Sequence, residues 1–331
     1  MSKSTESAEQ RLIGRYFRPL ATHPGAFGLA DDAAAITPPP GCDLVLTADG
    51  VIAGVHFLPG DPPESIGRKA LRMNLSDLAA KGAKPVGFLL SLALPARVSE
   101  SWIAEFAGGL AKDIERYDCP LLGGDTDHTP GPIAASIAAF GAVPHGGMVR
   151  RSTAKAGDVV IVTGTVGDAA LGVKLRRDSG LAKRWRLNKA MAAQLTQRYL
   201  LPEPRNALAK AVRLHASAAM DVSDGLAGDL GKLCHASKVA AEIDVERVPL
   251  SVAAHAVLAG APKLIETLLT GGDDYEIVLT LAPGELPGLR EAAKSTGVAL
   301  TEIGRIVKGD GARFMRGGKA LAFKQAAYSH F

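Results

Sequence analysis

Short apolar runs rich in valine, isoleucine and leucine alternate along the chain with segments of helical periodicity. These runs predict strands at 43–47, 86–94, 133–143, 158–163, 217–222, 240–245 and 275–281. Between many of them, apolar residues recur at the three- and four-residue spacing of an amphipathic helix. Strands and helices that alternate in this way indicate an α/β or α+β fold.

A glycine-rich and basic segment, "VPHGGMVRRSTAKAGD" at 143–158, separates two parts of the chain. It is poor in apolar residues, which is typical of a junction between domains. The chain of 331 residues is also longer than one ordinary domain. We therefore predict an N-terminal domain at 1–150 and a C-terminal domain at 151–331.

Composition narrows the class of protein. Hydrophobic residues make up 47% and charged residues 22% of the chain, values that are globular and argue against disorder. The net charge of +4 is not gathered into any block, so nothing favours a nucleic-acid or membrane surface. The N-terminus lacks the apolar core of a signal peptide, and no apolar stretch is long enough to span a bilayer. We therefore expect a soluble, cytoplasmic protein.

The cysteines Cys42, Cys119 and Cys234 stand far apart and show no C-x-x-C spacing. An odd number at such spacing fits neither a disulfide framework nor a zinc site. We interpret them as small apolar side chains in a reducing cytoplasm.

One aspartate occupies an apolar position of a predicted helix. In "SIGRKALRMNLSDLAAKGA", Asp77 falls on the stripe formed by Ile66, Ala70, Met73 and Ala80. An ionised carboxylate that faces inward costs at least several kcal/mol unless it has a partner. A salt bridge to a lysine or arginine elsewhere in the fold is the ordinary explanation, and a cation in a wet cleft is the functional one.

Further aspartates follow apolar runs or precede helices. They are Asp49 after "DLVLTA", Asp125 after "CPLLGG", Asp221 after "SAAM", Asp224 before a helix with Leu226, Leu230 and Leu233, and Asp31 and Asp32 in "GLADDAA". Taken singly, Asp224 has an equally good interpretation as a helix N-cap, and the Gly-Asp tips as turns. Because strand ends and helix starts gather into ligand crevices in α/β folds, we expect these carboxylates to converge.

The stretch "LLTGGDDYE" at 268–276 repeats the arrangement of "LLGGDTD" at 121–127. Both have an apolar run, two glycines and then acids, so both predict a buried strand with an acidic tip. The similarity hints at related halves, although it is too short to establish a repeat.

Carboxylates that converge without matching basic residues repel one another unless a hard cation lies among them. Oxygen ligands without neighbouring histidine or cysteine pairs favour Mg²⁺ over zinc. Because Mg²⁺ commonly bridges to phosphate oxygens, the pattern suggests a polyphosphate substrate. Gly167 and Gly172 have the Walker A spacing, but Val173 and Lys174 follow where Gly-Lys-Ser/Thr is required, and no G-x-G-x-x-G opens a helix. Any ATP site is therefore of another kind.

The full set of motifs resembles the thiamine-monophosphate kinase family, within the ATP-binding superfamily of aminoimidazole ribonucleotide synthetase. The motifs are "ADDAA", "LTADGVIAGVHF", "KALRMNLSDLAAKGAKP", "LLGGDTD", "RSTAKAGD", "VTGTVGDAALG", "DVSDGLAGDL", "GGDDYE" and "YSHF". They follow the family's order from about residue 10 to the C-terminus. The resemblance implies a two-domain fold: an N-terminal domain with a mixed sheet that dimerises through its strands, and a C-terminal α/β domain that completes the active-site cleft.

The implied activity is ATP-dependent phosphorylation of thiamine monophosphate to thiamine diphosphate, by direct transfer of the γ-phosphoryl group. The implied cofactors are several Mg²⁺ ions, with a monovalent cation as a further candidate. The implied partners are ATP, thiamine monophosphate and a second copy of the chain.

The resemblance also assigns site residues, position by position. The metal ligands are Asp31, Thr47, Ala48, Asp49, Asp77, Asp125, Asp221 and Asp224. The nucleotide-binding residues are Tyr117, Gly124, Asp125, Arg151 and Ser223. The residues for thiamine phosphate are His56, Asp273 and Tyr328, and the catalytic set is Asp49, Asp77, Asp125 and Arg151.

The chain departs from the family in a few places. Ala30 stands where a glycine is usual, Ala48 and Gly50 flank Asp49 in place of threonines, and Asp273 stands where glutamate is common. A metal contact through a side chain at 48 is lost, whereas one through the backbone carbonyl survives. Without the family, His56 has an ordinary interpretation as a packed loop histidine.

Two other functions remain open at this point. One is another ATP-using synthetase of the superfamily, acting on a purine intermediate or selenide. The other is a non-catalytic sensor that binds the nucleotide or thiamine diphosphate and releases no ADP. The complete set of aspartates and the C-terminal motifs favour the kinase.

Overall fold

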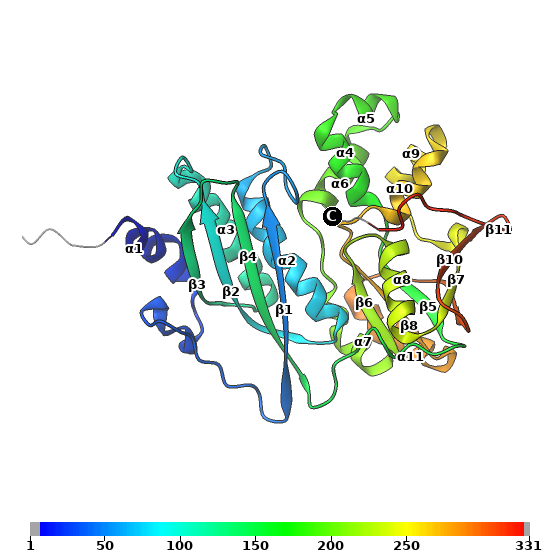
Figure 1. Cartoon of the computed structure of the whole chain (residues 1–331), viewed down its shortest axis with the longest axis horizontal. Helices are drawn as coiled ribbons and strands as arrows, with labels where there is room; N and C mark the ends of the chain where they lie inside the picture. Colours follow the sequence, from blue (N-terminus) through cyan, green and yellow to red (C-terminus); the bar gives the residue numbers. More distant parts are fainter. Residues whose placement is uncertain (1–6, 328–331) are drawn as a thin grey trace, which may run out of the picture. The chain divides into compact units, whose positions relative to one another are not determined.

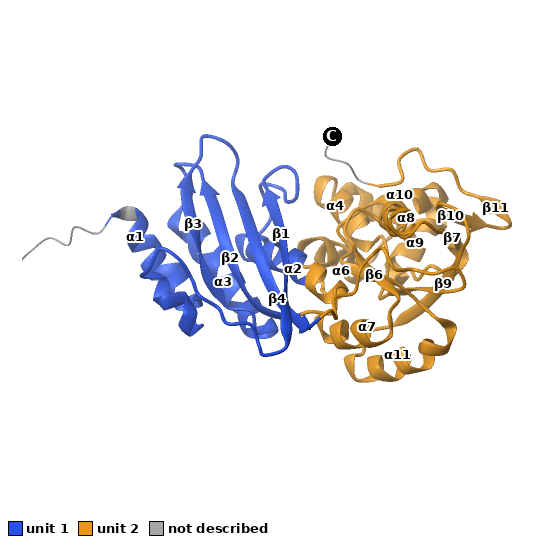
Figure 2. Cartoon of the chain, turned by 60° about the horizontal axis from the view of Figure 1, so that its bottom comes forward, with its two compact units in different colours: residues 1–75, 84–145 blue, residues 76–83, 146–331 orange. Residues whose placement is uncertain are grey.

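The structure, a computed structural model, describes residues 7–327, which fall into two compact units (Figure 2). The first unit runs to Leu75 and resumes from Lys84 to His145. The second contains Ser76–Ala83 and the chain from Gly146 onward. The last residues of the helix that carries Asp77 therefore pack with the second unit.

The described part of the first unit has a four-stranded sheet in the order β1-β4-β2-β3. Its strands are β1 (Cys42–Ile52), β2 (Lys84–Leu94), β3 (Leu121–His128) and β4 (Ala134–Pro144). β4 pairs antiparallel with β1 and β2, while β2 and β3 are parallel and are joined through α3 (Glu100–Tyr117). The helices α2 (Pro63–Ala80) and α3 cover one face of this sheet (Figure 1).

The N-terminal segment begins with α1 (Ala8–Leu12), which has a capping box formed by Ser7 and Gln10. The π-helix η1 (Ile13–Phe17) and the 3₁₀ segments η2 (Arg18–Leu20) and η3 (Pro24–Leu29) follow it. Phe17, Leu20 and Ala26 are buried, so this segment packs on the unit despite its irregular backbone.

A buried ion pair joins α2 to α3. Asp113 accepts hydrogen bonds from Arg72 Nε at 2.6 Å and Nη2 at 3.0 Å, and from Arg68 Nε at 3.1 Å. The side chains of Arg72 and Asp113 are both fully buried. The bidentate geometry satisfies groups whose isolated burial would be very costly.

In the second unit, the described residues form a seven-stranded sheet in the order β11-β10-β7-β9-β5-β8-β6. The strands are β5 (Val159–Thr163), β6 (Ala218–Val222), β7 (Ala240–Asp244), β8 (Glu276–Leu281), β9 (Leu300–Val307), β10 (Gly311–Arg316) and β11 (Lys319–Ala320). The pairing is antiparallel apart from β7 with β10.

The two-residue period of the strands divides the core of this unit between the two faces of the sheet. In β5, Val160 and Val162 pack in one buried cluster and Ile161 in another. The helices of this unit are α4 (Asp168–Arg177), α5 (Gly180–Arg184), α6 (Lys189–Leu200), α7 (Ala209–His215), α8 (Leu226–Ser237), α9 (Val252–Gly260), α10 (Ile265–Thr270) and α11 (Leu286–Ala293). Short 3₁₀ turns connect several of them.

The strands predicted at 43–47, 86–94, 133–143, 158–163, 217–222, 240–245 and 275–281 all fall on strands of the structure, but other details of the prediction are wrong. Asp49 and Asp125 do not end their strands, because β1 continues to Ile52 and β3 to His128. Long partner strands explain this, since Asp49 still pairs with Ile137 of β4 and Asp125 with Ser91 of β2.

The stretch at 268–276 is not a strand with an acidic tip. Leu268 and Leu269 end α10, and 271–275 form the loop before β8. The two GGD sequences therefore differ in local structure, since one lies in a strand and the other follows a helix. Asp224 does not cap α8 either, because Gly225 occupies the N-cap position. Within residues 7–327, no helix is long and apolar enough to cross a membrane.

We expect Asp113→Ala to destabilise the protein by about 3–5 kcal/mol, because it leaves the buried Arg72 guanidinium without this carboxylate. Urea unfolding followed by circular dichroism measures the change. Arg15→Ala is the matched control, because it removes the ion pair of Arg15 with Glu100. The side chains of this pair are 68% and 64% exposed, so its loss should cost little stability. An equal loss of unfolding free energy in both variants would contradict a larger contribution of the buried pair to stability.

Candidate functional site

The residues assigned to the site from the sequence are divided between the two units. The first unit contains Asp31, Thr47, Ala48, Asp49, His56, Tyr117, Gly124 and Asp125. The second contains Asp77, Arg151, Asp221, Ser223, Asp224 and Asp273. Tyr328 lies outside the described residues.

A cavity of about 600 Å³ lies in the first unit, between the N-terminal segment and the sheet. Buried leucines of β2 and β3, including Leu90, Leu121 and Leu122, form part of its lining. Asp31, Gly124 and Asp125 also line it, so it brings together three of the residues assigned from the sequence. Its volume and its mixture of apolar walls and a few acids are typical of a small-molecule site.

The backbone beside Asp125 admits only glycine. Gly124 has a φ of +154°, and a Cβ built there would lie 1.8 Å from the carbonyl oxygen of Leu90. Close packing of β3 on β2 therefore requires Gly124 and fixes the position of Asp125. The Oδ1 atom of Asp125 accepts the N–H of Thr126 at 2.9 Å, and Asp31 Oδ1 accepts that of Asp32 at 2.8 Å.

The alternation of β1 separates two of the residues assigned to metal binding. Thr47 and Asp49 share a strand face with Val45 and Val51, whereas Ala48 points to the opposite face. The N–H of Asp49 donates to Oδ1 of the buried Asn74 on α2 at 3.0 Å, which anchors this part of the strand.

His56 lies just beyond β1 and is held in place by its own loop. Its Nδ1 accepts the N–H of Ile52 at 3.1 Å, so in the neutral ring the proton is on Nε2. Its carbonyl oxygen accepts a hydrogen bond from Lys69 Nζ at 3.0 Å. The loop therefore presents an imidazole of defined orientation.

Tyr117 ends α3 between two guanidinium groups. The Cζ atoms of Arg72 and Arg116 lie 5.6 Å and 5.2 Å from the centre of its ring. Such contacts favour a fixed ring position. Tyr117 does not line the cavity that contains Asp31 and Asp125.

Acidic and basic groups are crowded around Asp221 in the second unit. Asp221 is buried, and burial raises its pKa well above the ordinary value. The neighbouring carboxylates of Asp77 and Asp229 raise this pKa further, and with burial they outweigh the opposite effects of Ser76 and Lys81. The fold thus brings Asp77 and Asp221 together, as the sequence predicts.

Lys81 is a basic residue of this group that the sequence analysis did not assign. Its Nζ donates to the carbonyl oxygen of Ala219 at 2.8 Å. Burial lowers its pKa, and the charge of Arg151 lowers it further, whereas Asp221 and Asp77 raise it. Arg151 is itself exposed, so it lies near the crowded acids at the surface of the unit.

The loop before β8 binds directly to the end of β6. The N–H of Asp273 donates to the carbonyl oxygen of Ser223, and that of Tyr275 to Val222, both at 2.8 Å. Asp273 has a φ of +72° and Tyr275 of +50°, conformations that are uncommon for residues other than glycine. The Tyr275 hydroxyl donates to Asp273 Oδ1 at 3.3 Å.

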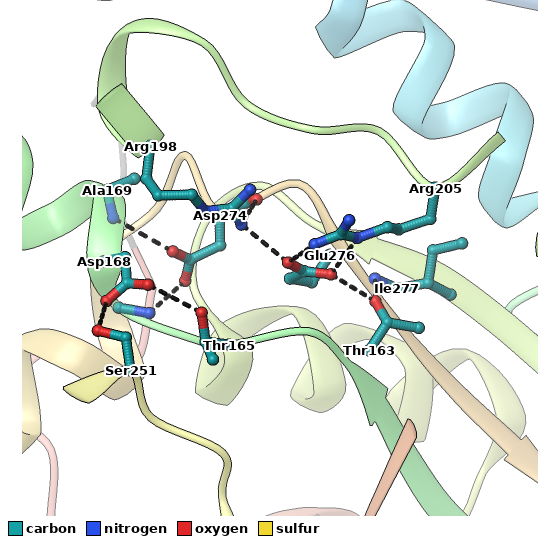
Figure 3. Close-up of polar contacts among 11 residues, drawn as sticks. Thr163, Thr165, Asp168, Ala169, Arg198, Arg205, Ser251, Asp274, Glu276 and Ile277 are labelled. Carbon is teal, nitrogen blue, oxygen red and sulfur yellow. Dashed lines mark hydrogen bonds and ion pairs between the residues drawn. The ribbon is translucent and has the colours of Figure 1, made fainter. Parts of the chain in front are cut away.

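Buried acids behind this loop hold it to the rest of the unit (Figure 3). Asp274 accepts the N–H of Gly167 at 2.7 Å, and burial raises its pKa well above the ordinary value. Glu276 accepts hydrogen bonds from Arg198 at 2.8 Å and Arg205 Nε at 2.6 Å. These contacts anchor the residues that follow Asp273 to α4 and to the segment from α6 onward.

Another buried acid, Asp168, lies in the first turn of α4 (Figure 3). Its carboxylate accepts from Ser251 Oγ at 2.5 Å and from Thr165 Oγ1 at 2.8 Å. Its pKa is raised by burial, which outweighs these hydrogen bonds. Protein donors bind these acids, so we interpret them as structural.

Sequence reasoning missed Asp229, Asp274, Glu276 and Lys81. A signal was present for Asp229, because it lies on the apolar stripe of α8 with Leu226, Leu230 and Leu233. No local signal marked Glu276, whose partners Arg198 and Arg205 lie 78 and 71 residues earlier in the chain.

The donor set fits Mg²⁺. The side chains assigned as ligands are carboxylates and a hydroxyl, which are the oxygen donors that a hard cation prefers. The crowding of Asp77 on Asp221 is also what a divalent cation would offset. Within residues 7–327, no group of three or more His, Cys, Asp or Glu side chains is already gathered in a form that could hold a metal ion.

The chain matches two family models along most of its length. Residues 30–143 match the AIR synthase related protein, N-terminal domain, and residues 155–316 match the corresponding C-terminal domain. Thiamine-monophosphate kinase of Caulobacter vibrioides is 42% identical over 322 residues, which cover 96% of this chain and 89% of that protein. The chain belongs to the thiamine-monophosphate kinase family.

Solved structures agree with this membership. Thiamine-monophosphate kinase from Stenotrophomonas maltophilia K279a is 38% identical and superposes with a TM-score of 0.82, covering 96% of this chain and 98% of that one. AaThiL complexed with AMPPCP and TMP is 32% identical with a TM-score of 0.76, covering 93% and 97%. The predicted two-domain fold of the aminoimidazole ribonucleotide synthetase type is therefore confirmed.

We expect Asp221→Asn to raise the melting temperature of this family member at neutral pH in the absence of Mg²⁺. The raised pKa means that folding favours the protonated carboxyl, so stability falls as pH rises from the ordinary value through the raised one. Asparagine removes this loss, because it has no carboxyl group to ionise.

Thermal unfolding at about pH 5 and about pH 8, with and without Mg²⁺, measures the effect. The advantage of the variant should be larger at the higher pH, and added Mg²⁺ should stabilise the variant less than the wild type. A variant that is less stable at the higher pH would contradict the interpretation of Asp221 as a destabilising charge.

Proposed function

We propose that the chain transfers the γ-phosphoryl group of ATP to thiamine monophosphate, which gives thiamine diphosphate and ADP. The observation that carries the proposal is the full-length likeness to thiamine-monophosphate kinases, at 42% identity over 96% of the chain. The geometry supports it, because a cavity with acids and a separate group of crowded aspartates are what a magnesium-dependent phosphoryl transfer requires.

In this reaction, a phosphate oxygen of thiamine monophosphate forms a bond to the γ-phosphorus, and the bond from that phosphorus to the β,γ-bridging oxygen breaks. The electron pair of the broken bond leaves with ADP. The acceptor phosphate is already ionised at neutral pH, so no strong general base is needed. The main barrier is repulsion between two anions, and bound Mg²⁺ supplies the positive charge that offsets it.

The aspartates of both units would hold the metal ions. These are Asp31, Asp49, Asp77, Asp125, Asp221 and Asp224, with the hydroxyl of Thr47 and the carbonyl oxygen of Ala48. The side chain of Ala48 offers no ligand and lies on the opposite strand face from Asp49, so only its backbone oxygen fits the role.

Arg151 would add a fixed fork of donors to the transferred phosphate, and Tyr117, Gly124 and Ser223 would complete the nucleotide site. His56, Asp273 and Tyr328 would bind thiamine phosphate. Asp273 suits this role because its carboxylate is partly exposed on a loop fixed from behind by buried acids. A negative charge in that position favours the cationic thiazolium ring.

We also propose the organisation that the family implies. Residues 1–150 would form the nucleotide, magnesium and dimerisation domain, and residues 151–331 the domain that completes the site. The protein would act as a homodimer in the cytoplasm, and a monovalent cation would be a further cofactor to test.

A coupled ADP-release assay tests the function directly. The purified chain is given ATP and Mg²⁺ with either thiamine monophosphate or free thiamine, and the product is identified by chromatography. We expect thiamine diphosphate from the monophosphate alone, because the acceptor is a phosphate. Magnesium-dependent nucleotide binding without turnover would contradict a kinase and favour a sensor, and turnover with another acceptor would favour a sister synthetase.

We expect Asp273→Asn to raise the KM for thiamine monophosphate by about tenfold or more, because a charge-assisted contact is worth roughly 1.5–3 kcal/mol. Asparagine is the right replacement, since it tolerates the φ of +72° at this position better than alanine. The KM for ATP should change much less. Steady-state kinetics decides the point, with Asp310→Asn as the control at an acid whose side chain is 73% exposed. A larger effect on ATP would reassign Asp273 to the nucleotide.

A further inference from the structure

Asp229 is a fully buried carboxylate that binds the turn ahead of its own helix. Its Oδ2 atom accepts the N–H of Ser223 at 3.0 Å and the N–H of Asp224 at 2.8 Å. Both donors precede Gly225, the N-cap of α8, so the carboxylate satisfies the turn and not the N–H groups of the helix. Its position in the first turn of α8 gives it this reach.

Lys232, one turn further along α8, completes the arrangement. Its Nζ donates to Asp229 Oδ1 at 2.8 Å and to Asp224 Oδ2 at 2.5 Å. The ammonium group therefore joins the buried acid to the carboxylate that the turn presents. Such a charge-assisted pair restricts the rotamer of Asp224 as well as its backbone.

The opposite side of the same turn binds the loop of Asp273. The carbonyl oxygen of Ser223 accepts the N–H of Asp273 at 2.8 Å. Gly272 packs against this oxygen so closely that a Cβ there would lie 2.2 Å from it. The N–H side of the turn is thus fixed by Asp229 and the carbonyl side by the loop at 271–275.

We propose that Asp229 is a positioning residue that holds the Ser223–Asp224 turn and, through Ser223, the loop of Asp273 in the geometry that the reaction needs. The proposal rests on the proposed function, which assigns Ser223 and Asp224 to nucleotide and metal and Asp273 to thiamine phosphate. Asp229 itself contacts no substrate in this account. Within the second unit, one buried carboxylate then fixes Ser223 and Asp224 relative to Asp273.

The buried carboxylate of Asp229 is a costly way to hold the Ser223–Asp224 turn, because a charge inside a protein needs donors around it. The side chain of Asp229 is fully buried, and its donors are Lys232 and the backbone N–H groups of Ser223 and Asp224. A polar uncharged residue would cap the turn at a smaller desolvation cost. A carboxylate adds the link to Lys232 and hence to Asp224, which an uncharged acceptor does not provide.

Asp229→Ala and Asp229→Asn test the proposal, with Asp158→Ala as the matched control. Asp158 is a buried aspartate of the same unit whose Oδ2 accepts the N–H of Lys155 at 3.0 Å, in a turn that contains no residue assigned to the site. Asparagine at 229 retains one acceptor oxygen for the N–H groups of Ser223 and Asp224 but turns an amide donor toward Lys232.

Three quantities are measured for each variant: the melting temperature, the KM for ATP and thiamine monophosphate, and the Kd for a non-hydrolysable ATP analogue with Mg²⁺ by calorimetry. We expect Asp229→Ala to raise both KM values and the Kd by roughly 10- to 100-fold, because small displacements of positioned groups have effects of this size. Asp229→Asn should lie between Asp229→Ala and the wild type. Asp158→Ala should lower the melting temperature while leaving KM and Kd unchanged.

Unchanged KM and Kd in Asp229→Ala, or the same changes in Asp158→Ala, would overturn the proposal and leave Asp229 a merely structural residue. If Asp229→Ala does not fold, Asp229→Asn decides: a Kd above that of the wild type supports the proposal and an equal Kd overturns it. Absence of turnover in the wild type would contradict the proposed function instead, while the calorimetric comparison still decides the role of Asp229.

Discussion

The burial of several carboxyl groups in the second unit determines how its strands, helices and loops are held together. Asp168, Asp221, Asp229 and Asp274 are buried, and burial raises the pKa of each of these carboxyl groups. Because each buried charge opposes folding, the surrounding helices and strands must supply donors or cations at the right places. The positions of the loop at 271–275 and of the Ser223–Asp224 turn follow from how that demand is met.

The acids meet the demand in two different ways. Some acids are bound by protein donors. Glu276 accepts hydrogen bonds from two arginines, and Asp113 of the first unit does the same. Asp168 accepts hydrogen bonds from hydroxyl groups, and Asp274 accepts one from a backbone N–H. Asp221 differs, because the nearby carboxylates raise its pKa more than Lys81 lowers it. The first group consists of acids that protein donors bind, whereas the crowding at Asp221 is a cost that a bound cation would relieve.

A further set of residues in the second unit transmits position. Asp229 and Lys232 on one side and the loop at 271–275 on the other hold a single turn, and that turn carries Ser223 and Asp224. Asp274 and Glu276 then fix the loop to the arginines and to α4. Rigid support of this kind is what an exposed carboxylate such as Asp273 needs in order to bind a ligand in one orientation.

Periodicity in the sequence was enough to predict the class of fold, since Val160 and Val162 pack on one face of the sheet and Ile161 on the other. It also predicted that Asp77 faces the interior, and the structure brings Asp77 close to Asp221. It did not predict that β1 and β3 continue past their aspartates, because strand length is set by the partner strand and not by local sequence. It could not reveal the arginine partners of Glu276, because their distance along the chain leaves no local pattern.

We propose that the crowded aspartates hold metal ions for phosphoryl transfer. The decisive measurement is a crystal structure of the chain with Mn²⁺ and a non-hydrolysable ATP analogue. An anomalous difference map locates the manganese ions. We expect manganese peaks in direct contact with carboxylate oxygens that include those of Asp77 and Asp221. Nucleotide bound with no manganese near these two residues would contradict the claim.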